Sequence, residues 1–295
     1  MDFTQKKYHK LLTTLQDGDY GFQTFADFMA KPEKPVVVLR HDVDRLPGNA
    51  LDMAQLEKKM GIVGSYYFRS VPGSWDAEII KKVHDLGHEV GYHYETMSKA
   101  AKMVNGKSCF SFTNNGALGR LKSLKELDKE GRSTFNADGE KVGEIELTNT
   151  AYELFRYELD CIRKIVPVKT AVMHGSPLSR FNNLDIWKKY DYRELVIIGE
   201  PYLDVDFSDV LYLTDTGRRW DGGSVSVRDK VKSGFTGPEF VFRTTSDIID
   251  AVIEKRLPDR IMINIHPQRW TDKPFPWFKE LVWQNIKNHI KRFIA

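Results

Sequence analysis

Two carboxylates and a histidine are crowded together just after an apolar stretch near the start of the chain. In "VVVLRHDVDR", the apolar residues Val36–Leu39 are followed by Arg40, Asp42 and Asp44. Such a cluster suits a divalent metal ion, although aspartates after a strand also form turns and helix caps. In an extended chain Asp42 and Asp44 point to one side and Val43 to the other, so both carboxylates can reach one site.

Other apolar stretches also end in side chains that bind metals or move protons. "HEVGYHYE" brings His93 and Glu95, "VKTAVMHGSP" ends in His174, and "RIMINIHPQRW" ends in His266. A single histidine at a strand end is usually just a half-buried polar residue. Because the carboxyl ends of parallel strands share one face of an α/β fold, several such residues are expected to meet in one site. Neutral imidazole and carboxylate together favour zinc, with water in an open position.

The segments that would position these residues alternate between strand and helix. Strands are expected at Val36–Leu39, Ile62–Arg69 and within "HEVGYH", with helices in "PGNALDMAQLEKKMG" and "SWDAEIIKKVHDLG" between them. Further strands are expected in "VKTAVMHG", "ELVIIGE", "DVLYLTD" and "IMINI". This alternation predicts an α/β fold with a parallel sheet and crossover helices.

A helix closes the chain, and its apolar residues are expected to face inward: Leu281, Ile286 and Ile290. The 295 residues are expected to form a single domain. A helix at Thr4–Leu15 begins an N-terminal helical extension over residues 1–30. A polar segment at about 97–149 reads as an inserted lid, with a basic helix around Leu118–Glu130.

Composition excludes several classes of protein. The formal charge is +3, from 44 basic and 41 acidic residues, and no block of like charge indicates a nucleic-acid partner. Two cysteines without C-x-x-C spacing argue against a disulfide framework or a cysteine zinc site. No apolar run approaches the roughly 18 residues of a membrane helix, and no signal-like segment opens the chain. The expectation is a cytoplasmic protein without stable membrane insertion.

The motifs resemble, in type and order, those of the polysaccharide deacetylase family, the NodB-homology or carbohydrate esterase 4 group. "RHDVD" is similar to the family's pair of aspartates, "LGHEVGYHYE" to its second, metal-binding motif, and "IMINIHP" to its last strand, which ends in a histidine. The resemblance implies a distorted, seven-stranded, TIM-like (β/α) barrel. It also implies a divalent metal, most simply zinc, and hydrolysis of an N- or O-acetyl group on a sugar.

The resemblance also implies roles for the residues that match the motifs. Asp42 would be the general base and His266 the general acid, while Asp44 and His93 would bind the metal. The roles of Asp42 and Asp44 could be exchanged, because both face the same way. A histidine suits proton delivery to the leaving amine or alkoxide near neutral pH.

The chain departs from the family in its second motif. The family places another histidine four residues after the first, but Met97 stands four residues after His93. A thioether is a poor ligand for a hard or borderline ion. The third ligand is therefore expected to be His174, which ends its own strand, with Glu95 as the alternative.

Arginines and tryptophans near the strand ends suit sugar rings and anionic groups. Three of the predicted contacts come from "LTDTGRRWDGG" and two from "HPQRW", and the arginine of "RHDVD" completes the set. The predicted substrate contacts are Arg40, Asp215, Arg218, Trp220, Arg269 and Trp270.

The leading hypothesis is a metal-dependent deacetylase that acts on an acetylated sugar, such as an intracellular polysaccharide precursor. One alternative is an amide (C–N) hydrolase with a substrate that is not a sugar. Another is a catalytically inactive barrel that binds a glycan, which the histidine missing at Met97 favours.

Overall fold

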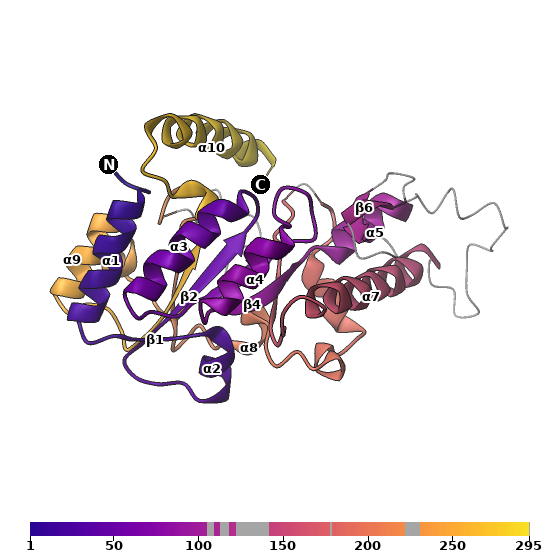
Figure 1. Ribbon diagram of the computed structural model, residues 1–295, viewed down its shortest axis with the longest axis horizontal. Coiled ribbons are helices and arrows are strands. Elements are labelled where there is room, and N and C mark those ends of the chain that lie inside the picture. Colours follow the sequence, from indigo (N-terminus) through magenta and orange to yellow (C-terminus); the bar gives the residue numbers. More distant parts are fainter. Residues whose placement is uncertain (105–108, 113–117, 122–141, 178, 222–230, 295) are drawn as a thin grey trace.

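The structure is a computed structural model of the chain, shown in Figure 1. It describes residues 1–104, 109–112, 118–121, 142–177, 179–221 and 231–294.

Seven parallel strands form one central sheet, in the order β7-β4-β3-β2-β9-β8, with β1 also paired to β2. The sheet curves into a distorted, partly open (β/α) barrel, which confirms the predicted fold class (Figure 1). The strands are β1 (Gly21–Gln23), β2 (Val36–Val43), β3 (Ser65–Phe68), β4 (Glu89–Tyr94), β7 (Ala171–Met173), β8 (Leu211–Thr214) and β9 (Arg260–Ile265).

Helices surround the sheet, with α1 beside α9 at one end of the molecule and α5 beside α7 at the other (Figure 1). None of the described helices is both long and apolar enough to cross a bilayer. The helices are α1 (Gln5–Asp17), α2 (Phe25–Ala30), α3 (Pro47–Lys59), α4 (Ala77–Asp85), α5 (Thr96–Val104), α7 (Val142–Arg163), α8 (Pro201–Asp204), α9 (Thr245–Ile253) and α10 (Pro274–Ile294).

Strand β2 is the centre of the fold and is longer than the sequence predicted. It was expected to stop at Leu39, but it continues to Val43 and is buried along its whole length. Its side chains alternate between two cores: Val37 and Leu39 pack with the cluster that includes α1 and α9, while Val36 and Val38 face the barrel interior. The two-residue period then sends the next even-numbered side chains of β2 to the interior as well.

The strand can carry charged residues because they pair with one another and with a residue of α8. Arg40 donates from Nε and Nη2 to the two carboxylate oxygens of Asp42, at 2.9 and 2.6 Å. Its guanidinium also lies 4.9 Å from the ring centre of Tyr202 and donates to the Tyr202 hydroxyl at 2.9 Å. A buried charge is tolerated when it is paired and hydrogen-bonded, so the polar stretch stays extended.

Gly91 of β4 makes room for a tyrosine inside the barrel. A Cβ at this position would lie 2.2 Å from Cε1 of Tyr67. The Tyr67 hydroxyl is held by Thr170, with 3.0 Å between the two oxygens. The absence of a side chain at Gly91 therefore lets the tyrosine fill the interior below the strand ends.

The predicted strand in "ELVIIGE" is wrong. Tyr192–Leu195 form a short 3-10 helix, and Val196 follows in the left-handed region at φ 57°. A left-handed residue breaks the extended backbone that a strand requires. All that remains of a ladder in this segment is one isolated bridge between Thr170 and Gly199.

The N-terminal segment and the predicted insertion both contribute regular structure. Residues 1–30, predicted as a helical extension, also contain β1, which joins the sheet through β2. Met97 lies in the first turn of α5 and is buried in the core, and β5 (Cys109–Phe112) pairs with β6 (Leu118–Leu121). The start of the predicted basic helix, Leu118–Leu121, is thus a strand, and its remainder lies outside the described residues.

Helix α10 turns a polar face inward, and not the apolar one that was predicted. Ile286 is 46% exposed and Leu281 is only half-buried, while Gln284 and Asn288 are buried. The Gln284 amide donates to Asn288 Oδ1 at 2.9 Å, so polar groups on the inner face satisfy one another. The prediction for Ile286 is wrong, and the Ile290 side chain lies outside the described residues.

Candidate metal centre

One carboxylate and two histidines from three strand ends converge at the mouth of the barrel. Asp44 follows β2, His93 lies in β4, and His174 follows β7. The Oδ1 atom of Asp44 is 3.6 Å from Nε2 of His93 and 3.5 Å from Nε2 of His174. One ligand atom from each residue lies within 4.8 Å of the other two. The structure thus brings together the three residues that the sequence predicted as ligands.

The hydrogen bonds of the two imidazoles leave their Nε2 atoms pointing at this cluster. Nδ1 of His93 lies 3.1 Å from the carbonyl oxygen of Val172 and donates to it, because a carbonyl only accepts. Nδ1 of His174 lies 2.9 Å from Oγ of Ser176. The bond from His93 to a carbonyl fixes its tautomer and leaves a lone pair on Nε2 for a cation, and the contact with Ser176 holds the His174 ring with Nε2 toward Asp44.

The carboxylate of Asp44 completes a set of acceptors. Its Oδ1 is buried and has no hydrogen-bond partner in the described structure, while Oδ2 accepts from Nε2 of Gln268 at 3.3 Å. Burial alone would raise the pKa of Asp44, but His93, His174 and Arg69 outweigh it and hold the pKa well below its ordinary value. Asp44 is therefore a carboxylate with an oxygen available to a cation.

The Asp42 side chain is more deeply buried than that of Asp44. Its Oδ2 is 4.0 Å from Nε2 of His93 and accepts from Nδ2 of Asn264 at 3.2 Å. Burial opposes ionisation of this carboxyl, yet Arg40 and then His93 keep its pKa below the ordinary value. Asp42 is thus an ionised group at the edge of the cluster, oriented by Arg40.

His266 approaches the cluster from β9, with Nε2 3.9 Å from Oδ2 of Asp44. Its Nδ1 is 2.6 Å from Oδ1 of Asp215, which is fully buried. Asp215 also accepts from the Arg269 guanidinium at 2.5 Å and from Trp270 Nε1 at 2.7 Å. Since a carboxylate only accepts, Nδ1 carries the proton, and Nε2 faces the cluster. Burial opposes ionisation of Asp215, but Arg269 and His266 lower its pKa.

Glu95, the alternative ligand, lies behind His174. Its Oε2 is 3.4 Å from Nδ1 of His174, the nitrogen that points away from Asp44. The same oxygen accepts from Nη2 of Arg69 at 2.7 Å. Burial acts against it, but Arg69 and His174 hold the pKa of Glu95 well below its ordinary value. The structure therefore groups His174, and not Glu95, with Asp44 and His93.

The residues predicted to contact substrate are almost completely buried. Trp270 has no exposed surface and Trp220 donates from Nε1 to Thr245 Oγ1 at 2.9 Å, so both indoles belong to the core. The structure brings none of the six to an open surface of the cluster. Arg40, Asp215 and Arg269 orient Asp42 and His266 from behind, whereas Arg218 donates to the Trp277 carbonyl.

Two residues beside Asp44 were missed by sequence reasoning. Nη1 of Arg69 lies 3.6 Å from Oδ1 of Asp44, and Gln268 donates to Oδ2. The signal for Arg69 was present, because it directly follows β3 just as Asp44 directly follows β2. Gln268 gave no such signal, because it lies in a 3-10 helix after β9 that no pattern predicted.

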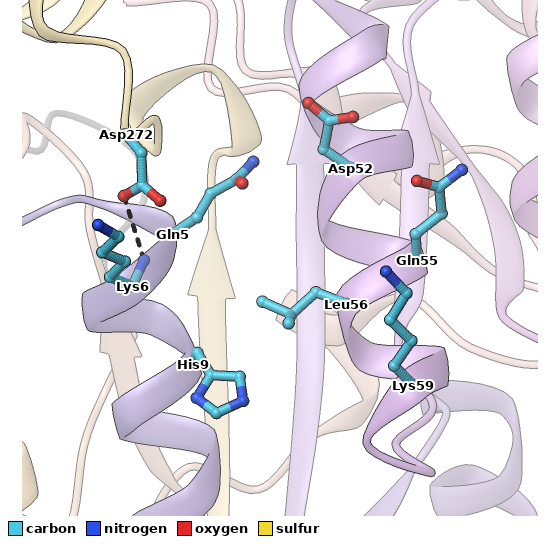
Figure 2. A pocket seen from close by; sticks show the side chains of 8 residues that line it. All are labelled: Gln5, Lys6, His9, Asp52, Gln55, Leu56, Lys59 and Asp272. Atoms are coloured by element: carbon cyan, nitrogen blue, oxygen red, sulfur yellow. Dashed lines mark hydrogen bonds between the residues drawn. The ribbon is translucent and has the colours of Figure 1, made fainter.

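A separate groove lies on the outer helical layer. Figure 2 shows side chains of α1, among them His9, facing side chains of α3, among them Lys59, across this groove. The backbone amide of Lys6 donates to Oδ1 of Asp272 at 3.2 Å on its rim (Figure 2). None of its lining residues belongs to the metal cluster.

Comparison with known proteins gives a structural likeness alone. No protein-family model matches the chain, and no curated protein matches it. It is similar to the solved structure of a wild-type CE4 family pseudoenzyme from Bacillus anthracis, with a TM-score of 0.40, 11% identity, and coverage of 88% of this chain and 63% of that one. A mutant of that pseudoenzyme with restored enzymatic activity gives a TM-score of 0.40, 11% identity, and coverage of 88% and 65%. The chain thus spans just under two thirds of these proteins. A likeness of this strength says nothing of activity, so function has to be inferred from the site.

Proposed function

We propose that the chain is a metal-dependent hydrolase that removes an acetyl group from a sugar. The observation that carries this proposal is the convergence of Asp44, His93 and His174, with Asp42 on one side and His266 on the other. A ligand set, a carboxylate base and an imidazole acid around one point are the parts that hydrolysis of an acyl group needs.

The residues present fit a divalent ion. Oδ1 of Asp44 is buried without a partner, and two imidazole Nε2 atoms lie 3.5 and 3.6 Å from it. Three acceptors facing one point repel one another unless a cation lies between them. One carboxylate and two histidines suit zinc and leave a position open for water. When bound, the ion would polarise the acetyl carbonyl and make water more acidic.

The chain's own residues would move the protons. Asp42, ionised and held by two bonds from Arg40, takes a proton from the attacking water. His266 gives a proton from Nε2 to the leaving nitrogen or oxygen, while Asp215 holds Nδ1. The ionised Asp215 stabilises the charged imidazole before that transfer.

The acetylated sugar rests on the resemblance of "RHDVD", "LGHEVGYHYE" and "IMINIHP" to the polysaccharide deacetylase motifs. One observation favours the alternative of a catalytically inactive, glycan-binding barrel. The guanidinium of Arg69, 3.6 Å from Oδ1 of Asp44, is a positive charge next to the position that a metal would occupy. If the Arg69 guanidinium alone neutralises the negative charge of the Asp44 carboxylate, the protein binds no metal.

Elemental analysis of protein purified without chelators tests the proposal. We expect about one divalent ion per chain, and acetate but no ammonia released from acetylated sugars. His93→Ala should lose the ion and the activity together, because it removes one of three ligands. His9→Ala, which changes an exposed histidine on α1, is the matched control and should keep both. Wild-type metal content in His93→Ala would overturn the ligand assignment. A wild-type protein without metal or turnover would favour the inactive barrel.

A further inference from the structure

A cavity of about 540 Å³ opens beside the metal cluster. It lies between α5 and the segment that follows β7, and Arg69, Glu95 and His174 line its inner end. Phe181 supplies an apolar wall. Because His174 belongs both to the cluster and to the cavity, a molecule in the cavity would reach the reacting position.

The lining of this cavity carries an excess of positive charge. Its cations are Arg69, Lys102 and Arg180, and its one carboxylate is Glu95. Arg69 pairs with Glu95 at 2.7 Å, so that carboxylate is already matched. Lys102 and Arg180 are exposed, and no acidic side chain of the described residues pairs with either. Within the part of the chain that the structure describes, these two cations therefore have no acidic partner and can face a ligand.

Buried donors in the same wall also lack partners. Ser98, only 4% exposed, lines the cavity, and its Oγ has no hydrogen-bond partner in the described structure. Nε of Arg69 is buried without a partner as well. Buried donors are normally satisfied, and a ligand oxygen would satisfy both of these. Cations and unpaired donors in one wall are the features of a site for an anion.

We infer that the sugar substrate carries an anionic substituent, a phosphate or a carboxylate, which binds between Lys102 and Arg180 while the acetyl group reaches the metal cluster. This inference rests on the proposed function and adds the class of substrate to it. Phosphate and carboxylate share the chemistry that these side chains recognise, namely negatively charged oxygens that accept hydrogen bonds.

The test compares three sugars on the zinc-loaded protein: N-acetylglucosamine, its 6-phosphate and N-acetylmuramic acid. We expect kcat/KM for at least one charged sugar to exceed that for the neutral one by about 10-fold or more, with the advantage shrinking as salt is added. The charged sugar with the higher kcat/KM shows whether the site prefers a phosphate or a carboxylate. In the double variant Lys102→Gln/Arg180→Gln, the ratio of kcat/KM for the charged sugar to kcat/KM for the neutral sugar should fall to about one, because both cationic side chains are gone.

Lys81→Gln is the matched control, since Lys81 is exposed on α4 and outside the lining of this cavity. It should keep the wild-type ratio. Equal turnover of all three sugars by wild-type protein would overturn this inference and leave the proposed hydrolase intact. If no sugar is turned over, the hydrolase fails, and calorimetric titrations with the 6-phosphate and with N-acetylmuramic acid decide the inference. Binding that the double variant loses supports the anion site, and no binding overturns it.

Discussion

Asp215→Asn isolates the group that orients His266. The change removes one negative charge and nearly preserves the shape of the side chain. The Oδ1 and Oδ2 atoms of Asp215 together accept from Nδ1 and the backbone amide of His266, from Arg269 and from Trp270. An asparagine has one accepting oxygen and one NH₂ group, so it cannot accept all of these bonds.

The size of the effect follows from burial. Asp215 has no exposed surface, and the change leaves the Arg269 guanidinium, itself buried, without its counter-charge. Breaking such a buried pair by removing one partner costs about 3–5 kcal/mol of the free energy of unfolding. For catalysis, loss of a well-oriented general acid lowers the rate by about 10²–10⁴-fold. We therefore expect kcat to fall at least about 100-fold, with KM nearly unchanged, because the side chain is out of reach of a substrate.

Urea denaturation measures the stability, and steady-state kinetics on the metal-loaded protein separate kcat from KM. Asp52→Asn, which changes an exposed aspartate on α3, is the matched control and should behave as wild type. A rise in KM with unchanged kcat would show that Asp215 contacts the substrate, as the sequence alone predicts. Wild-type values of both constants would refute the role of His266 as an acid oriented by Asp215.

Three further changes test the interior of the fold. Gly91→Ala should lower the free energy of unfolding by about 1–3 kcal/mol, because its Cβ would lie 2.2 Å from the Tyr67 ring. Combining Gly91→Ala with Tyr67→Leu should recover part of that loss. If urea denaturation shows that the two changes lower the free energy of unfolding additively, the clash between Cβ and the Tyr67 ring is not the cause. Burial raises the pKa of Glu200 from 4.5 to about 7, so between these pH values the folded state keeps a proton that the unfolded state has released. The free energy of unfolding of wild type should therefore fall by about 3 kcal/mol more than that of Glu200→Gln as pH rises through this range, and parallel pH profiles would argue against it. Lys99→Met should lower the free energy of unfolding by about 3–5 kcal/mol, because it leaves the buried carboxylate of Glu158, now 2.7 Å from the Lys99 ammonium, without its counter-charge. Adding Glu158→Gln to this variant should restore much of the lost stability in thermal denaturation. No recovery would rule out the unbalanced Glu158 charge as the cause of the loss.

The sequence predicted the cluster better than it predicted the surroundings. Alternation along an extended chain requires Asp42 and Asp44 to face one side, and both carboxylates do reach His93. Parallel strands bring their carboxyl ends to one face, which explains why His174 and His266 arrive at the same place from distant parts of the chain. These inferences needed only local geometry and the direction of the strands.

Errors came where long-range packing overrules local composition. Trp220 and Trp270 look like sugar-stacking residues in a loop, but both are buried in the core with Phe3 of the N-terminal segment. Ile286 looks like a core residue of α10, but the structure turns polar side chains inward there and leaves it exposed. Which face of a helix is covered depends on the partner that the fold supplies, and composition alone does not name that partner.

The sequence by itself determined that strands alternate with helices, that charged and imidazole groups end several strands, and that Asp42 and Asp44 share a side. Periodicity and chain direction suffice for these conclusions. Only the tertiary structure decided that Asp44 lies between His93 and His174, that Glu95 stands behind, and that β2 continues through Arg40. Those outcomes depend on distances between residues far apart in the chain, which strand register and side-chain packing set together.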